Sequence, residues 1–232
     1  MHRLYSKINT LVTQIGGIRQ FSECNGKMYW PQRGVYLFVD YNEFSPATSN
    51  IPKIVRVGTH GVSRGSKTRL WDRLKTHKGL NDGGGSHRSS VFRLHVGNAI
   101  IKRDDIKCAT WAEGQNASKE VRANEQYLER LVSEYIGSLG VIFIDINDDP
   151  SAQSLRAFIE SNTIAMLSTI NYSMDFASAS WLGYCSNKTE IRNSSLWNIN
   201  ATRATVSSDY FPTLDACIET TIKNYNRKER GK

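Results

Sequence analysis

Three segments decide how this chain folds: GVYLFV at residues 34–39, IVRVGT at residues 54–59 and LWDRLKTH at residues 70–77. The first two are runs of β-branched and aromatic residues joined by a connection rich in Asn, Ser and Pro, which is typical of a β-hairpin with a long loop. Within residues 68–78, Leu70 and Leu74 recur four positions apart, and so do Arg73 and His77. This spacing predicts a helix that places a cation and an imidazole on one stripe, beside a hairpin that carries a tyrosine.

The rest of the chain adds one more strand and several helices. Residues 141–146 form a short apolar run bounded by polar turn residues, which predicts a buried strand. Periodic apolar positions predict helices at residues 4–20, 91–101, 125–136, 154–167 and 211–225. We therefore expect an α/β fold with a small, mainly antiparallel three-stranded sheet, made by residues 34–39, 54–58 and 141–146 and flanked by helices. No repeat or clear linker divides the chain, so residues 1–232 are expected to form a single domain.

Composition limits the classes of function. With 39% hydrophobic and 22% charged residues the chain is not disordered, and its net charge of +8 favours a polyanionic partner such as nucleic acid. The four cysteines form no CxxC pair, which argues against a zinc knuckle or a redox motif. There is no run of about 18 apolar residues, so we expect no membrane segment and a cytoplasmic location.

The three opening segments resemble the motifs of the GIY-YIG nuclease family. Gly34-Val35-Tyr36 stands at the first motif, Arg56-Val57-Gly58 at the second, and Arg73 with His77 at the family's helical Arg and His. The resemblance implies a nuclease core at about residues 30–170, with an insertion at 79–120 and a loop-rich C-terminal extension at 171–232. The chain departs from the pattern at Arg56, which replaces the second motif's tyrosine and cannot act as a base.

The resemblance also implies a catalytic set. Tyr36 would be the general base on water, Arg73 would hold the scissile phosphate, and Glu160, beside the apolar stripe of its helix, would bind Mg²⁺ or Mn²⁺. His77 would hydrogen-bond the tyrosine or the phosphate. Several other assignments stay open. His60 or His77 could take the place of the second tyrosine, Glu129 is an alternative metal ligand, and Arg156 could be a structural partner of Glu160. An asparagine is expected to close the site: Asn198, with Asn162, Asn193 and Asn200 as its alternatives.

Basic side chains near these residues are candidates for nucleic-acid contact. Arg64, Lys67 and Arg69 lie in or next to the small-residue loop at 61–68, and His87 with Arg88 follows a glycine-rich loop that is expected to expose both. Arg56 could add a phosphate contact. His95 is instead expected to be a hydrogen-bonded histidine in the core. The expected partner is DNA, with RNA and a homodimer left open, and the alternative to an endonuclease is a catalytically inactive basic module that binds nucleic acid.

Overall fold

A computed structural model describes residues 1–47, 51–80 and 82–230; Ser49 and Asn50 of the predicted polar connection lie outside this range. Its centre is a four-stranded antiparallel sheet in the order β1-β4-β2-β3. The strands are β1 (Arg19–Gln20), β2 (Gly34–Phe44), β3 (Pro52–Gly58) and β4 (Gly140–Asp145). The predicted α/β class and the three predicted strands are confirmed. The predicted strand count is wrong by one, because the two residues of β1 are too few to produce a periodic pattern.

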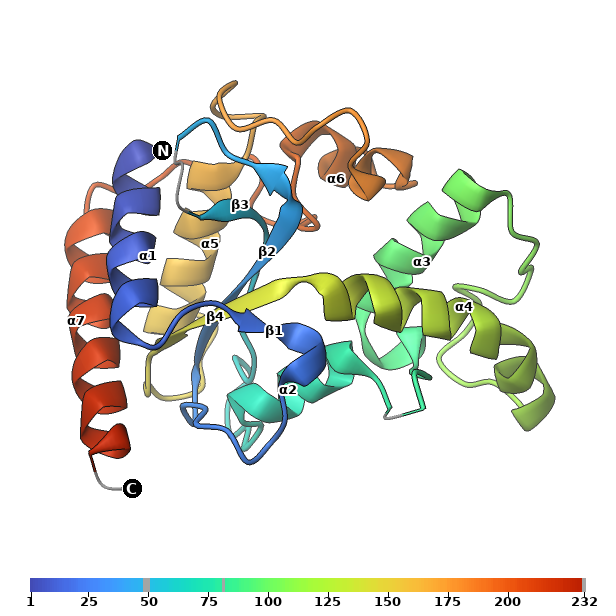
Figure 1. Cartoon of the computed structure of the whole chain (residues 1–232), viewed down its shortest axis with the longest axis horizontal. Coiled ribbons are helices and arrows are strands. Elements are labelled where there is room, and N and C mark those ends of the chain that lie inside the picture. The colour runs from blue at the N-terminus through green and yellow to red at the C-terminus, as the bar shows by residue number, and fades with distance from the viewer. Residues whose placement is uncertain (48–50, 81, 231–232) are drawn as a thin grey trace.

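Helices cover both faces of this sheet. They are α1 (His2–Gln14), α2 (Leu70–Lys78), α3 (Val91–Asp104), α4 (Lys119–Ser138), α5 (Leu155–Leu167), α6 (Thr189–Ser194) and α7 (Tyr210–Glu229), with 3₁₀ turns η1 (Phe21–Glu23), η2 (His87–Ser89) and η3 (Leu182–Cys185). Figure 1 shows α1, α5 and α7 together on one side of the sheet, and α2, α3 and α4 on the other. None of the helices in the described residues is long and apolar enough to cross a membrane.

Strand β2 is the centre of the core. Residues 34–40 are all buried, so both faces of the strand are covered, unlike a strand with one face in water. Tyr36 and Phe38 point toward α2 and α3, since the ring of Phe38 lies 5.5 Å from that of Phe92 and 6.2 Å from that of His77. Burying each such aromatic ring stabilises the fold by about 2 kcal/mol, and it fixes α2 against the first-motif strand.

The C-terminal extension closes the open edge of β3. The Trp197 amide donates to the Val55 carbonyl at 2.7 Å, and the Asn198 side chain both accepts from the Val57 amide at 3.0 Å and donates to its carbonyl at 2.8 Å. A buried ion pair of 2.7 Å between Lys53 of β3 and Asp175 adds a second attachment. The extension thus satisfies an edge strand that would otherwise present unpaired backbone groups.

Candidate active site

The two motif glycines are required by close packing. Tyr36 of β2 pairs with Gly58 of β3, and a Cβ atom on Gly58 would lie 2.2 Å from the tyrosine hydroxyl oxygen. A Cβ atom on Gly34 would lie 2.3 Å from the Ile144 carbonyl oxygen. Only glycine allows these approaches. Gly58 therefore lets the tyrosine ring lie across the neighbouring strand with its hydroxyl over the end of β3, and Gly34 allows β2 to approach β4 closely.

His77 fixes the position of that hydroxyl. Its Nε2 atom is 2.8 Å from the Tyr36 oxygen, and its Nδ1 atom is 2.8 Å from the Ser90 hydroxyl, which also caps α3 by accepting from the Arg93 amide. The imidazole is fully buried. Burial, followed by the positive charges of Arg56, Arg73 and Arg93, holds the pKa of His77 well below its usual range. The ring is consequently neutral and acts as a fixed hydrogen-bond partner for Tyr36.

Arg73 lies one turn before His77 on α2. This helix begins where the Arg69 amide donates to the Asp72 carboxylate at 3.0 Å, and it ends at Gly79, whose φ is +85°. The Arg73 side chain is half-buried, and the described residues provide no hydrogen bond or ion pair to its guanidinium. Its positive charge contributes to lowering the pKa of both His77 and Glu160. A half-buried guanidinium without a protein partner is suited to an anionic substrate group.

Glu160 reaches the same region from α5, a helix that Ser154 caps by accepting from the Ala157 amide at 3.3 Å. One carboxylate oxygen of Glu160 accepts from the Thr59 amide at 3.0 Å, just past the end of β3. Burial raises the pKa of Glu160, and the charge of Arg56, the Thr59 amide and the charges of Arg73 and Arg156 oppose this shift. Glu160 is thus a half-buried carboxylate that interacts electrostatically with Arg73.

Competing assignments for this carboxylate fail on geometry. Arg156 does not pair with Glu160; it forms an ion pair with Asp148. Glu129 accepts from Arg93 at 2.6 Å and from His87 at 2.9 Å, so its oxygens are taken. No cluster of three or more His, Cys, Asp or Glu side chains in the described residues could hold a metal ion. One carboxylate nevertheless fits Mg²⁺, which keeps several waters and often takes its other ligands from substrate phosphates.

Arg56 is a buried cation rather than a surface contact. Only 9% of the residue is exposed; its Nη1 atom donates to the Trp197 carbonyl at 2.6 Å, and its guanidinium lies 4.5 Å from the centre of the Phe92 ring. The expected phosphate contact is replaced by these two protein contacts. Burial raises the pKa of Glu160, and the charge of Arg56 is the largest influence that lowers it. Arg56 therefore acts on the site through its charge, although it does not face solvent.

His60 and Asn198 lie close to these residues but are engaged differently. Neither ring nitrogen of His60 makes a hydrogen bond of normal geometry, and burial with the charge of Arg156 lowers its pKa to about 4. His60 is therefore neutral at neutral pH. Asn198 uses both atoms of its amide on the Val57 backbone, and the alternative Asn162 donates to the Phe158 carbonyl. Both asparagines serve the fold in this structure, and a role in closing the site stays a prediction for Asn198.

The predicted nucleic-acid contacts divide into two groups. Arg64, Lys67 and Arg69 are exposed, as expected, on the loop that leads into α2. The expected exposure of His87 and Arg88 is wrong. These two residues are held by α4 instead of facing solvent.

Carboxylates on α4 explain this error. The His87 ring is stacked 3.8 Å from that of Trp111 and contacts Glu129, while Arg88 binds both oxygens of Glu125 at 2.6 and 2.9 Å. The expectation for His95 is also partly wrong: it is buried, but neither ring nitrogen has a hydrogen-bond partner among the residues that the structure describes.

Several residues of the site were not predicted. Ser90 orients His77, the Thr59 amide orients Glu160, and Arg93 links α3 to α4 through Glu129. Ser90 carried a signal, because a serine directly before an apolar helical pattern is a typical N-cap. The backbone of Thr59 carried none, since any residue has an amide at that position.

Comparison with known proteins agrees with this geometry. A family model described as a GIY-YIG domain matches residues 1–224. The match takes in the insertion and most of the C-terminal extension, which is more of the chain than the short motifs alone cover. No curated protein and no solved structure matches the chain.

Proposed function

The chain belongs to the GIY-YIG domain family, a family of nucleases, and we propose that it is an endonuclease that hydrolyses phosphodiester bonds in DNA with the help of one Mg²⁺ ion. One observation carries this proposal. The Tyr36 hydroxyl is held by His77 at 2.8 Å, and the positive charge of the unpartnered Arg73 acts both on His77 and on the half-buried Glu160. These groups come from β2, α2 and α5, so the fold and not local sequence brings them together.

Each side chain has a role in hydrolysis that matches its chemistry. Tyr36 would take the proton of the attacking water, and His77 would keep the hydroxyl oriented. The guanidinium of Arg73 would bind a non-bridging oxygen of the scissile phosphate and stabilise the additional negative charge of the pentacoordinate state. Burial and the positive charge of Arg56 disfavour a cationic His77, so the imidazole stays a neutral hydrogen-bond partner of the Tyr36 hydroxyl.

Glu160 would hold the metal. Its carboxylate oxygen that does not accept from Thr59 has no hydrogen-bond donor among the described residues, and it is the natural ligand atom. Bound Mg²⁺, or Mn²⁺ in its place, would supply positive charge at the leaving oxygen. Because burial raises the pKa of Glu160, protons compete with the metal at a higher pH than for an ordinary glutamate.

A second candidate is an inactive basic module that binds nucleic acid. Two observations favour it: Arg56 replaces a motif tyrosine, and only 1% of Tyr36 is exposed, which leaves little room for water at its hydroxyl. The two candidates differ in one measurable property, since only the enzyme has a metal-dependent rate.

The test measures cleavage of plasmid DNA with Mg²⁺ and with EDTA, alongside binding of labelled DNA. Glu160→Gln should lower the rate by roughly 100-fold or more while affinity changes only a few-fold, because a metal ligand is removed and the positive surface stays. Glu134→Gln, an exposed glutamate on α4, is the matched control. Equal rates for Glu160→Gln and Glu134→Gln would remove Glu160 from the site.

Arg73 separates the two candidates. In the enzyme, Arg73→Ala should reduce the rate far more than the affinity, and Arg73→Lys should rescue poorly because a point charge cannot reproduce the guanidinium fork. Arg203→Ala, at an exposed arginine, is the control. A binding module would show no metal-dependent cleavage in any variant, and Arg73→Ala would lower its salt slope by about one unit.

A further inference from the structure

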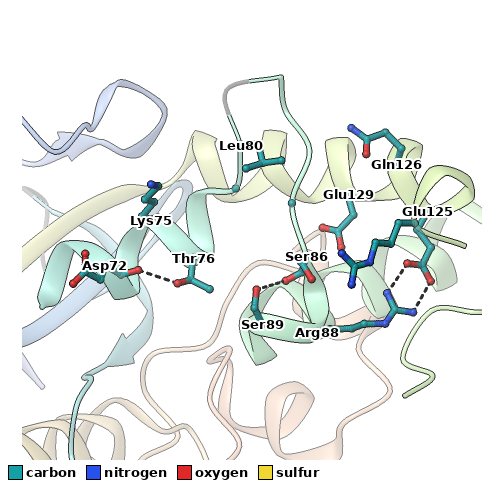
Figure 2. Close-up of a pocket in the computed structure, with 13 residues that line it drawn as sticks. Asp72, Lys75, Thr76, Leu80, Ser86, Arg88, Ser89, Glu125, Gln126 and Glu129 are labelled. Carbon is teal, nitrogen blue, oxygen red and sulfur yellow. Dashed lines mark hydrogen bonds and ion pairs between the residues drawn. The ribbon is translucent and has the colours of Figure 1, made fainter. Parts of the chain in front are cut away.

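A cavity of about 470 Å³ lies beside the catalytic helix, outside the set of residues assigned to catalysis. It is bounded by α2, by the loop that precedes η2 and by α4. Figure 2 shows the elements from which four of the lining residues come: Lys75 from α2, Leu80 and Ser86 from the loop, and Gln126 from α4. The volume falls within the usual range for small-molecule sites.

Some of the polar side chains that line the cavity are paired with other residues, and some are not. The carboxylate of Glu125 is paired with Arg88, and that of Glu129 is paired with Arg93. In contrast, among residues 1–47, 51–80 and 82–230 no hydrogen bond or ion pair is formed by the side chains of four lining residues: Lys75, Ser86, Arg122 and Gln126. The groups left for a ligand are therefore two cations, a hydroxyl and an amide, together with one oxygen of the Asp72 carboxylate, whose other oxygen accepts from the Arg69 amide. The cations suit a phosphate, and the neutral groups with the carboxylate oxygen suit the polar edge of a base.

The position of the cavity connects it to the catalytic residues. Arg73 and His77 occupy one stripe of α2, and the cavity-lining residue Thr76 lies three positions after Arg73 on the neighbouring row of the same helix, while Lys75 lies further around it. An α-helix is only about 10 Å across. A strand whose phosphate lies at Arg73 can therefore place a neighbouring nucleotide in the cavity.

We propose that this cavity binds one nucleotide of the substrate strand, unstacked from its neighbours and adjacent to the scissile phosphate. The inference rests on the proposed function for the existence of a nucleic-acid substrate. Lys75 on α2 and Arg122 on α4 provide positive charge for the phosphates on either side of that nucleotide, and the Gln126 amide offers a donor and an acceptor to the edge of its base. Leu80, which is 63% exposed, provides an apolar surface for the base face.

The test uses the full chain in EDTA, so that no cleavage occurs, and oligonucleotides that carry 2-aminopurine at successive positions. Unstacking raises the fluorescence of this base, and one position should respond on binding. Lys75→Ala, Arg122→Ala and Gln126→Leu should each abolish most of this response. Arg122→Ala should also lower the salt slope of binding by about one unit.

Arg130→Ala is the matched control, because Arg130 is also an exposed arginine on α4 but does not line the cavity. If no position responds, or if Arg122→Ala and Arg130→Ala behave alike, the inference is overturned even when the protein cleaves DNA. If the response is present but Mg²⁺ produces no cleavage, the enzyme proposal fails and the nucleotide site stands.

A free nucleotide offers the same chemistry as a nucleotide within a strand, so dAMP is titrated separately. Displacement of the 2-aminopurine response by dAMP, with loss of dAMP binding in Arg122→Ala, supports the site. Binding of dAMP that leaves the oligonucleotide response unchanged would overturn the assignment to a strand. Gln126→Leu could lose the response because it misfolds. Lys75→Ala tests the same site without this risk, since Lys75 is exposed and its substitution should leave the fold intact.

Discussion

Gly58→Ala is expected to damage both stability and the catalytic arrangement. The new Cβ atom would lie 2.2 Å from the Tyr36 oxygen and 2.3 Å from its Cζ atom, so the ring must move by about 1 Å to reach normal contact. Little space is available, because Tyr36 is 1% exposed and its ring lies 5.5 Å from those of Phe38 and His77. Overpacking of this kind costs about 1–3 kcal/mol.

The loss of the Tyr36 to His77 hydrogen bond adds to this cost. A buried polar group left without its partner costs about 1–3 kcal/mol, so the free energy of unfolding should fall by about 3 kcal/mol in total. Displacement of a catalytic group by about 1 Å can lower a rate roughly 100-fold. The loss of rate should therefore exceed what the fraction of unfolded protein explains.

Urea unfolding and plasmid cleavage measure the two effects. Gly137→Ala is the control, because the nearest atom to its new Cβ would be 3.5 Å away, an ordinary contact. A Gly58→Ala variant that loses less than about 0.5 kcal/mol, the size of a neutral surface change, and cleaves normally would show that the Tyr36 ring does not lie over β3.

The buried groups around the site make three further predictions. Asn198→Ala should lower the free energy of unfolding in urea by about 2 kcal/mol, because it removes two hydrogen bonds from the edge of β3, whereas exposed Asn200→Ala should have almost no effect. Burial lowers the pKa of both His60 and His95 to about 4, so their contribution to stability is complete above the unfolded value of about 6.5 and is lost as the pH falls toward 4. For each histidine, the free energy of unfolding should be about 3 kcal/mol lower at pH 4 than at neutral pH. His60→Gln should therefore make the free energy of unfolding less dependent on pH, and an unchanged pH dependence would contradict the burial of His60 as a neutral ring. Because the pKa of Glu160 is raised, the Mg²⁺ concentration needed for half-maximal cleavage should increase as the pH falls, and a pH-independent requirement would place the metal elsewhere.

The features that sequence predicted best are those carried by local periodicity. The helix containing Arg73 and His77 begins at Leu70 and ends at Lys78, close to the predicted residues 68–78, and strand β4 begins one residue before its predicted start. These elements have strong apolar patterns and clear ends. The fourth strand was missed because a two-residue pairing is made by the sheet and not by its own sequence.

The contacts that sequence could not predict join residues far apart in the chain. His87 and Glu129 are 42 positions apart, and Arg56 and Trp197 are 141 positions apart. A basic residue after a glycine-rich loop has the same local pattern whether it faces water or a buried carboxylate. Only the packing of α4 against the insertion decides that Arg88 is neutralised by Glu125, and that packing is a property of the whole fold.

Arg56 shows why departure from a motif has to be judged in the structure. A tyrosine at this position could offer a hydroxyl, whereas the guanidinium offers a permanent charge. That charge is held in place by the Trp197 carbonyl and by the Phe92 ring. Burial raises the pKa of Glu160, and the charge of Arg56 is the largest influence that lowers it. By favouring an ionised Glu160, Arg56 supports the form of the carboxylate that binds a cation. The substitution therefore removes a possible base while it keeps Glu160 closer to the ionised form that a cation requires, and it is compatible with a catalytic site in which Tyr36 is the base.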